Sequence, residues 1–357
     1  MEISEIKVDG YEKVARCRDH ASGLHALIAV HDTTLGPALG GLRMLPYVSE
    51  DEALFDVLRL AKGMTYKSAV GETGLGGGKS VILGEPSKVK SRALFEAMGM
   101  FVESFGGRYI TAEDMNIGIP DLEIVKTKTR WVTGLSRESG SSGNPSPYTA
   151  RGCFLGVQAV AHEVWGSTDL NGKHVLIQGV GAVGGRLAIM LKEAGAKLTI
   201  CDINEARVKE LSAKHGFAVV ADDNHLDVAC DIYSPCARGA TLNDASIPKL
   251  KCRAIGGAAN NQLLQPEHGD QLKKRGIVYA PDYVINAGGI INVGVEMLPG
   301  GYHEEESLRR IDRIPHNLRK VFEISKRDSI STQLAADRLA IERIQAAKAA
   351  KSPAKTR

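Results

Sequence analysis

The second half of the chain alternates short apolar runs with segments of helical length, and this alternation restricts the possible folds more than any other feature. Six runs have the length and composition of β-strands, namely 174–178, 197–202, 217–220, 228–233, 253–256 and 277–280. Most of the segments between them are long enough to form a helix that crosses back over a sheet. The sequence therefore predicts a doubly wound α/β domain in this half.

A glycine-rich loop follows the first of these strands. The six residues that start at Gly179 read Gly-Val-Gly-Ala-Val-Gly, and a helical pattern begins soon after them. Gly179 permits a tight turn, Gly181 lets a pyrophosphate approach the backbone, and Gly184 lets helix and strand pack closely. Ala182 and Val183 belong to the same loop. This pattern predicts a dinucleotide-binding site.

The second strand ends in a carboxylate, Asp202. An acidic residue about 20 positions after such a loop can accept hydrogen bonds from both ribose hydroxyls of an adenosine. A 2′-phosphate would meet this negative charge, and the next residues, Ile203 and Asn204, supply no arginine to offset it. We therefore predict NAD rather than NADP. The alternative is that the glycines merely form a tight turn and Asp202 caps the next helix.

The length of the chain, 357 residues, favours two domains with a cleft, because domains average about 150 residues. Residues 139–147, rich in Ser, Gly and Pro, cannot continue a regular helix or central strand, so we place the boundary there. The predicted domains are 1–147 completed by a C-terminal helix in 332–357, and 148–331. We expect Thr149 to cap the first helix of the second domain.

The first half also mixes strands and helices. Strand-like runs occupy 24–31, 79–83 and 108–112, and helical patterns occupy 51–66 and 88–105. This indicates an α/β domain whose topology the sequence leaves open.

Charge and composition exclude several classes of protein. The formal charge of +3 is too small to indicate nucleic-acid binding, and the apolar runs are too short to span a membrane. The N-terminus does not resemble a secretory signal, so we expect a cytoplasmic protein with reduced cysteines. The histidines and cysteines show no metal-binding spacing, and we expect no metal.

Two lysines and an aspartate are the candidate catalytic groups. Lys67 ends a helical face that apolar residues begin, and Lys79 follows a glycine run at the start of a strand. Two such cations about 6 Å apart would repel each other by roughly 2–3 kcal/mol at an effective dielectric near 20, about two pKa units. One lysine could then stay charged while the other transfers protons. In Glu113-Asp114, at a strand end, only one side chain can face a cleft.

Four motifs, at 36–44 (GPALGGLRM), 62–67 (KGMTYK), 76–79 (GGGK) and 280–289 (APDYVINAGG), resemble the glutamate/leucine/phenylalanine/valine dehydrogenase family. The resemblance runs from about Leu24 to Ile344. Segments 141–147 and 324–328 favour the leucine branch of that family.

The resemblance implies reversible oxidative deamination of an L-amino acid with NAD, and it assigns roles to particular residues. Lys67 would hold the substrate carboxylate, Lys79 would polarise the carbonyl or activate water, and Asp114 would shuttle protons at the amine. The backbone around Gly40 and Gly41 would line the same spot. Four further residues would contact the coenzyme, namely Asn261, Thr149, Cys236 and Ala237. The implied assembly is a homo-oligomer, an octamer or a dimer, formed through the N-terminal substrate-binding domain.

By the same resemblance, the substrate side chain would lie among uncharged residues, namely Leu39, Met64, Ala112, Ile290 and Val293. Such a pocket disfavours glutamate and favours leucine and other branched-chain amino acids. Residues 115–117 and the second asparagine of Asn260-Asn261 resemble the tryptophan branch instead, so an aromatic substrate is the alternative. A hydroxy-acid dehydrogenase and a non-catalytic NAD-binding sensor are further readings, and the presence of Lys67, Lys79 and Asp114 disfavours both.

Overall fold

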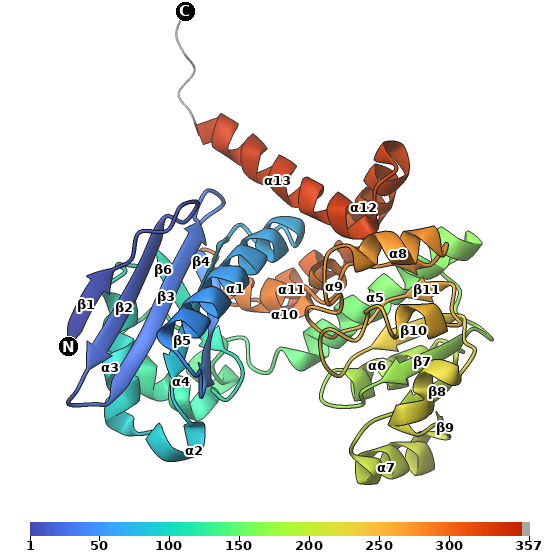
Figure 1. Ribbon diagram of the computed structural model, residues 1–357, viewed down its shortest axis with the longest axis horizontal. Coiled ribbons are helices and arrows are strands. Elements are labelled where there is room, and N and C mark those ends of the chain that lie inside the picture. The colour runs from blue at the N-terminus through green and yellow to red at the C-terminus, as the bar shows by residue number, and fades with distance from the viewer. Residues whose placement is uncertain (352–357) are drawn as a thin grey trace, which may run out of the picture. The chain divides into compact units, whose positions relative to one another are not determined.

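A computed structural model describes residues 1–351 of the chain, which form two compact units (Figure 1). The first unit comprises residues 1–144 and 292–304, together with the described chain from Ile341 onward. The second unit comprises residues 145–291 and 305–340. Each unit is an α/β structure with its own sheet, as the sequence predicts.

The first unit is built on a six-stranded mixed sheet in the order β1-β2-β3-β5-β4-β6. Its strands are β1 (Glu2–Glu5), β2 (Lys13–Asp19), β3 (Leu24–Asp32), β4 (Ala38–Leu45), β5 (Gly76–Leu83) and β6 (Tyr109–Glu113). β4 is parallel to both of its neighbours, β5 and β6, and the other pairs are antiparallel. Strand β4 thus lies between β5, which carries Lys79, and β6, which leads to Asp114.

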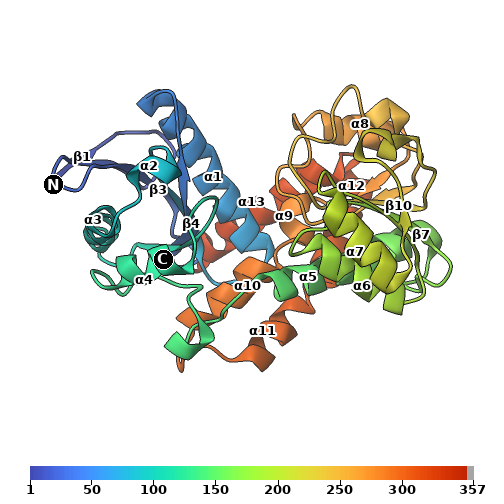
Figure 2. The same cartoon turned by 90° about the horizontal axis from the view of Figure 1, so that it is seen from below.

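Helices cover the two faces of this sheet (Figure 2). Helix α1 (Glu50–Val70) packs through Ala53, Val57 and Ala61 against one face, which we call the α1 face. Helices α3 (Arg92–Glu103) and α4 (Ile119–Lys126) cover the other face, and the short α2 (Pro86–Val89) precedes them. Because side chains alternate along a strand, Leu27 and Ala29 of β3 pack toward α1 and their neighbours pack toward α3.

The second unit contains a six-stranded parallel sheet in the order β12-β11-β10-β7-β8-β9. Its strands are β7 (His174–Gln178), β8 (Lys197–Cys201), β9 (Ala218–Val219), β10 (Ile232–Pro235), β11 (Ala254–Ile255) and β12 (Val278–Tyr279). From β7 the chain first proceeds outward to β9 and then returns to β10 on the other side of β7. This is a doubly wound fold whose strand order reverses between β7 and β10, which is where such sheets normally bind ligands.

The remaining helices complete the two units. They are α5 (Ser146–Trp165), α6 (Gly184–Glu193), α7 (Glu205–His215), α8 (His268–Lys274), α9 (Asp282–Ile285), α10 (Gly288–Gly294), α11 (Glu304–Ile311), α12 (Ile314–Asp328) and α13 (Thr332–Lys351). Short 3₁₀ turns lie at Arg137–Ser139, Asp222–Asp227, Ile247–Lys249 and Val295–Met297. Within residues 1–351, no helix combines the length and apolar character needed to cross a bilayer.

The division of the chain differs from the expected boundaries in two places. Residues 292–304, expected in the nucleotide-binding domain, belong to the first unit, and α13 is divided between the units after Ala340. The Glu296 carboxylate explains the first difference, because it accepts hydrogen bonds from Gly134 N (3.0 Å), Ser142 N (2.9 Å) and Ser141 Oγ (2.6 Å). These bonds tie the returning segment to the first unit.

The end of the chain is tied to the first unit in a similar way. Arg343 Nη1 donates to the carbonyls of Ala69 (3.0 Å) and Val70 (2.9 Å), and its Nη2 lies 3.2 Å from Glu72 Oε1. The last carbonyls of a helix have no partner within the helix, and a cation there is also favoured by the helix dipole. Arg343 therefore caps the carboxyl end of α1.

Two local predictions were wrong, and one strand was missed. Thr149 does not cap a helix, because α5 already begins at Ser146 and Thr149 donates from both N (3.0 Å) and Oγ1 (3.1 Å) to Pro145 O. The helical pattern at 88–105 is interrupted, since Ser91 caps a new helix by accepting from Leu94 N. Strand β4 was missed, because none of the strand-like runs in the sequence covers 38–45 and the Gly-Gly pair weakens the strand pattern there.

We expect Glu296→Ala to destabilise the first unit by about 2–4 kcal/mol, because it leaves three donors without their acceptor. The measurement is urea unfolding followed by tryptophan fluorescence in a Trp165→Phe background. Trp131 is then the single remaining tryptophan, and it lies in the first unit.

The matched control is Glu304→Ala, which removes an exposed ion pair with Arg137 (2.8 Å) from the same returning segment. Exposed pairs contribute little, so this variant should unfold like the parent. Equal unfolding of the two variants would show that Glu296 does not anchor the segment.

Candidate active site

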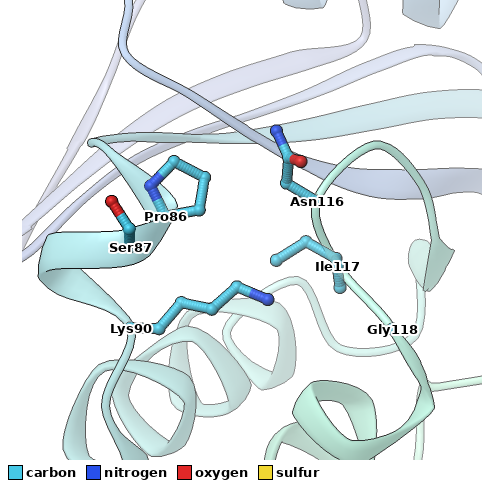
Figure 3. A pocket seen from close by; sticks show the side chains of 6 residues that line it. All are labelled: Pro86, Ser87, Lys90, Asn116, Ile117 and Gly118. Carbon is cyan, nitrogen blue, oxygen red and sulfur yellow. The ribbon is translucent and has the colours of Figure 1, made fainter.

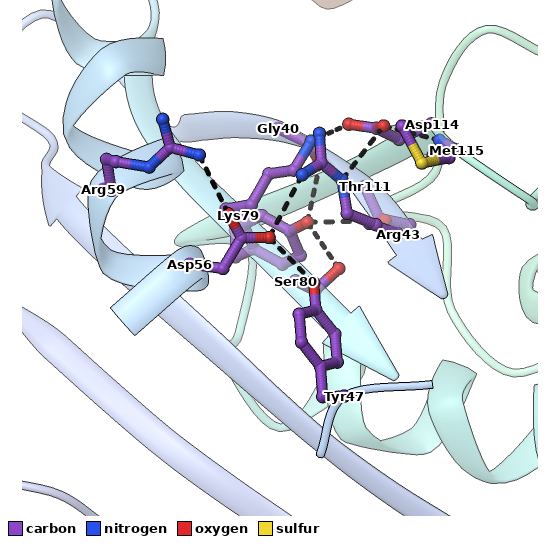
Figure 4. Close-up of polar contacts among 11 residues, drawn as sticks. Gly40, Arg43, Tyr47, Asp56, Arg59, Lys79, Ser80, Thr111, Asp114 and Met115 are labelled. Atoms are coloured by element: carbon purple, nitrogen blue, oxygen red, sulfur yellow. Dashed lines mark hydrogen bonds and ion pairs between the residues drawn. The ribbon is translucent and has the colours of Figure 1, made fainter. Parts of the chain in front are cut away.

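The first unit brings Lys79 and Asp114 into direct contact (Figure 4). Lys79 lies on β5 with 3% of its surface exposed, and Asp114 follows the end of β6. Strand β4 separates β5 from β6, so about 10 Å lies between the two backbones. The Lys79 side chain must therefore cross β4 to reach the carboxylate.

Glycines in β4 make this crossing possible. The register places Gly41 opposite Ala112 of β6 and Leu42 opposite Ser80 of β5, so Gly41 is level with Lys79. A Cβ on Gly41 would stand 2.8 Å from Asp114 Cβ, and one on Gly40 would stand 1.7 Å from the carbonyl oxygen of Gly78. Neither position has room for a side chain. The carbonyl of Gly40 also accepts a hydrogen bond from the buried Tyr109 hydroxyl (2.6 Å).

The alternation of the strands decides which side chains share a face with Lys79. Val81 packs on the α1 face, and Lys79 is two residues away on the same strand. Leu39, Gly41, Ala112 and Asp114 fall on that face by their register, and Glu113 falls on the other. Burial raises the pKa of Glu113.

The surroundings of Lys79 disfavour its charged form. Burial lowers the pKa of its ammonium well below the ordinary value, and the charges of Arg43 and Lys67 lower it further. The carboxylate of Asp56 acts in the opposite direction. Asp114, in contact, also favours the ammonium. This balance produces a lysine that can exchange a proton under conditions in which a free lysine would stay charged.

Lys67 and Met64 both lie on α1, which covers this face. They are three residues apart and both are partly buried. Val293 is 8% exposed in the returning segment of the first unit, and Ile290 is 8% exposed in the second unit. The first unit thus holds Leu39, Met64, Ala112 and Val293 of the predicted substrate pocket.

In the second unit, the glycine loop connects β7 to α6. Gly179 has φ +94°, and a Cβ there would stand 2.6 Å from Ala237 N. A Cβ on Gly184 would stand 2.0 Å from Gly179 O, whereas one on Gly181 would meet nothing within 4 Å. The loop is therefore closed on its protein side and open at Gly181. Ala182 is exposed and Val183 partly so.

Asp202 follows β8, and its carboxylate is oriented by two backbone groups. Oδ2 accepts from Val180 N (2.8 Å) and Oδ1 accepts from Asn204 N (2.9 Å). This couples the carboxylate to the glycine loop. Arg207, to which no sequence motif points, lies beside the loop with its Nε 3.4 Å from Val180 O.

The turn after β10 lies beside the glycine loop. Cys236 N donates to Gln178 O (2.7 Å), and a Cβ on Gly184 would stand 2.9 Å from Cys236 Cβ. Both turns therefore occupy the point where the strand order reverses. Asn261 has φ +51°, and its carbonyl accepts from Ala240 N (2.7 Å), just beyond that turn.

Two more features were not predicted. Arg43, Tyr47 and Asp56 form a polar network around Asp114, which is described below. Cys201, Asp222 and His225 place possible metal-ligand atoms within 4.8 Å of one another, although no metal-binding spacing was expected. His225 already bonds Asp222 O through Nδ1, and its Nε2 lies 3.3 Å from Tyr233 Oη.

An open surface hollow of about 480 Å³ has neither Lys79 nor Asp114 among its lining residues (Figure 3). Its lining residues are Pro86, Ser87, Lys90, Asn116, Ile117 and Gly118. The Lys90 ammonium pairs with Asp121 (2.6 Å), so the hollow does not hold an unbalanced charge at that point.

Comparison with known proteins identifies the class of protein that this fold and site define. The sequence profile of the Glu/Leu/Phe/Val dehydrogenase dimerisation domain matches residues 11–133, and that of Glutamate/Leucine/Phenylalanine/Valine dehydrogenase matches residues 199–352. The chain belongs to this family and is an amino-acid dehydrogenase.

Its relatives act on several amino acids. Leucine dehydrogenase of Geobacillus stearothermophilus is 52% identical over 96% of this chain and 93% of its own length. Phenylalanine dehydrogenase of Thermoactinomyces intermedius is 46% identical over 94% of this chain and 92% of its own length. The crystal structure of L-tryptophan dehydrogenase from Nostoc punctiforme is similar with a TM-score of 0.85 and 42% identity, covering 95% of this chain and 97% of that one.

We expect Gly40→Ala to destabilise the first unit by about 3 kcal/mol or more, because the new methyl group would overlap the carbonyl of Gly78. Urea unfolding followed by Trp131 fluorescence in the Trp165→Phe background measures the loss. Gly63→Ala is the control, since its Cβ meets nothing within 4 Å and alanine favours a helix. If both variants are as stable as the parent, the close approach of β4 to β5 is not as described.

Proposed function

We propose that this protein catalyses the NAD-dependent, reversible oxidative deamination of an apolar L-amino acid, preferably leucine and other branched-chain amino acids. The products are the 2-oxo acid, ammonium, NADH and a proton, and water is consumed. The observation that carries the proposal is the buried contact of Lys79 with Asp114, on the sheet face that α1 and Lys67 cover. Membership in an amino-acid dehydrogenase family supports it.

The proton chemistry follows from the proposed roles. Lys67 binds the substrate carboxylate, which orients the α-carbon. Once the substrate is oxidised to the imine, neutral Lys79 accepts a proton from the water that adds to this carbon, and its lowered pKa suits that step. Asp114 exchanges protons with the departing amine. In the reverse direction, the Lys79 ammonium polarises the carbonyl of the 2-oxo acid.

The residues of the second unit fit a bound NAD. Gly181 leaves open space at the amino end of α6, where backbone N–H groups favour a pyrophosphate. The Asp202 carboxylate, which Val180 N holds in place, can accept hydrogen bonds from the ribose hydroxyls and would repel a 2′-phosphate. Asn261, Thr149, Cys236 and Ala237 are proposed to contact the nicotinamide half. When bound, NAD accepts the hydride that leaves the substrate α-carbon.

The preference for an aliphatic substrate rests on the uncharged pocket residues and on the leucine dehydrogenases among the relatives. A glutamate side chain would lose the solvation of its carboxylate there. An aromatic substrate is the second candidate. The similarity to tryptophan dehydrogenase and the Met115-Asn116-Ile117 segment favour it.

We further propose a homo-oligomer, because the profile of a dimerisation domain matches the first unit. An octamer and a dimer are both compatible with that match. The expected cytoplasmic location stays a prediction.

Lys79→Ala should lower kcat for L-leucine by about 10²–10⁴-fold, the usual range for loss of a general acid–base group. NADH binding, followed by titration calorimetry, should be nearly unchanged, since the coenzyme residues belong to the second unit. Lys62→Ala is the control, because Lys62 is exposed on the same helix as Lys67. Normal turnover of the Lys79 variant would remove this lysine from the mechanism.

The substrate preference has its own test. Met64→Ala and Ala112→Val should each change the ratio of kcat/KM for leucine over valine by about tenfold or more, with a smaller effect on kcat. An NADH absorbance assay with Leu, Val, Phe, Trp and Glu measures these ratios. Val48→Ala, at a position that is 91% exposed, should leave them unaltered. Ratios that stay constant in the two pocket variants contradict the proposed pocket.

A further inference from the structure

A chain of charged side chains leads from Asp114 to the surface of α1 (Figure 4). Arg43 Nε lies 3.4 Å from Asp114 Oδ1, and its Nη1 lies 3.0 Å from Asp56 Oδ2. Tyr47 Oη donates to the same Asp56 oxygen (2.8 Å), and Arg59 Nη2 binds the other at 3.1 Å. Arg43 thus bridges the carboxylate that touches Lys79 and a second carboxylate on the helix.

The bridge is largely removed from solvent. The side chains of Arg43 and Asp56 are 16% and 14% exposed, whereas that of Arg59 is 51% exposed. Burial raises the pKa of Asp56, but Tyr47, Arg43 and Arg59 outweigh it and keep that pKa below the ordinary value. The Asp56 carboxylate therefore stays ionised and fixes the position of the Arg43 guanidinium.

We propose that Arg43 and Asp56 are positioning residues of the deamination reaction: Arg43 holds the Asp114 carboxylate in place beside Lys79, and Asp56 anchors Arg43. This inference rests on the proposed function of Lys79 and Asp114. It adds two charged residues of opposite sign whose effects on the reaction can be separated.

The two charges should act on Lys79 in opposite directions. The Arg43 cation disfavours the Lys79 ammonium, and it competes with Lys79 for Asp114. Asp56 favours the ammonium directly, although it also holds Arg43. The other groups that bear on Lys79 are Asp114, in contact, and the Lys67 cation. Glu113 points to the other face of the sheet.

These signs predict how the pH profile changes. Turnover in the deamination direction needs neutral Lys79, so kcat rises as the pH passes through its pKa. Arg43→Gln should move this rise to higher pH by about one unit. Asp56→Asn should move it to lower pH, by up to about one unit. If the network were merely structural, both variants would have a lower kcat, but their pH profiles would not shift in opposite directions.

The experiment measures kcat for L-leucine against pH in the full-length protein with saturating NAD. Arg59→Gln is the control, because Arg59 binds only the solvent side of Asp56 and should shift the profile by a few tenths of a unit at most. Arg43→Lys retains the cation and should restore the wild-type profile with part of kcat. If Arg43→Gln does not fold, the pH profiles of Arg43→Lys and Asp56→Asn still test whether these two charges control the protonation of Lys79.

Thermal melts over the same pH range give a readout that needs no turnover. A lysine whose pKa is lowered by folding makes stability rise as the pH increases through the folded pKa, because the unfolded chain still binds the proton. The onset of this rise should move up in Arg43→Gln and down in Asp56→Asn.

The outcomes separate the two proposals. If the pH profiles and the melts of Arg43→Gln and Asp56→Asn shift in the same direction, or do not shift, the proposed role of Arg43 and Asp56 is overturned. Turnover by the wild-type protein would still support the proposed function. Absent turnover with every amino acid overturns the proposed function. Opposite shifts in the melts would then still support the electrostatic coupling.

Discussion

The amino group of Lys79 is kept almost entirely out of water, and its charged form is tolerated there only beside a partner. The partner is Asp114, which lies two strands away. That single contact requires a strand between β5 and β6 without a side chain at the crossing point, which explains Gly41, whereas the close approach of β4 to β5 explains Gly40. It also requires α1 to cover the face on which the pair lies. The local architecture of the first unit follows from keeping this pair both buried and reachable.

The sequence predicted the second unit better than the first because the two units use different kinds of information. Strands β7 and β8 are apolar runs next to a glycine loop, and their parallel pairing follows from the helix between them. The first unit pairs β4 with β5 and β6 across long stretches of chain. No local pattern specifies that order, and β4 itself, with its glycines, does not look like a strand.

The candidate site shows the same limit. Lys79 and Asp114 could be proposed from their motifs, but their contact depends on the strand order, which spacing along the chain does not encode. Arg43 lies inside the 36–44 motif, in which only Leu39 and the glycines were expected to line the site, and Asp56 looks like an ordinary charge on a helix. Only the fold shows that these residues meet. Glu296 was overlooked for a similar reason, since its partners lie more than 150 positions away.

The first unit is assembled from three separate stretches of chain, and this affects how the protein can be made. The segment that bears Glu296 and the part of helix α13 that bears Arg343 leave the ribosome long after residues 1–144. A nascent chain that ends before them carries α1 without its cap and the 134–142 region without its carboxylate. Residues 1–144 are therefore synthesised well before the segments that complete their unit, and until those segments follow, they lack these contacts.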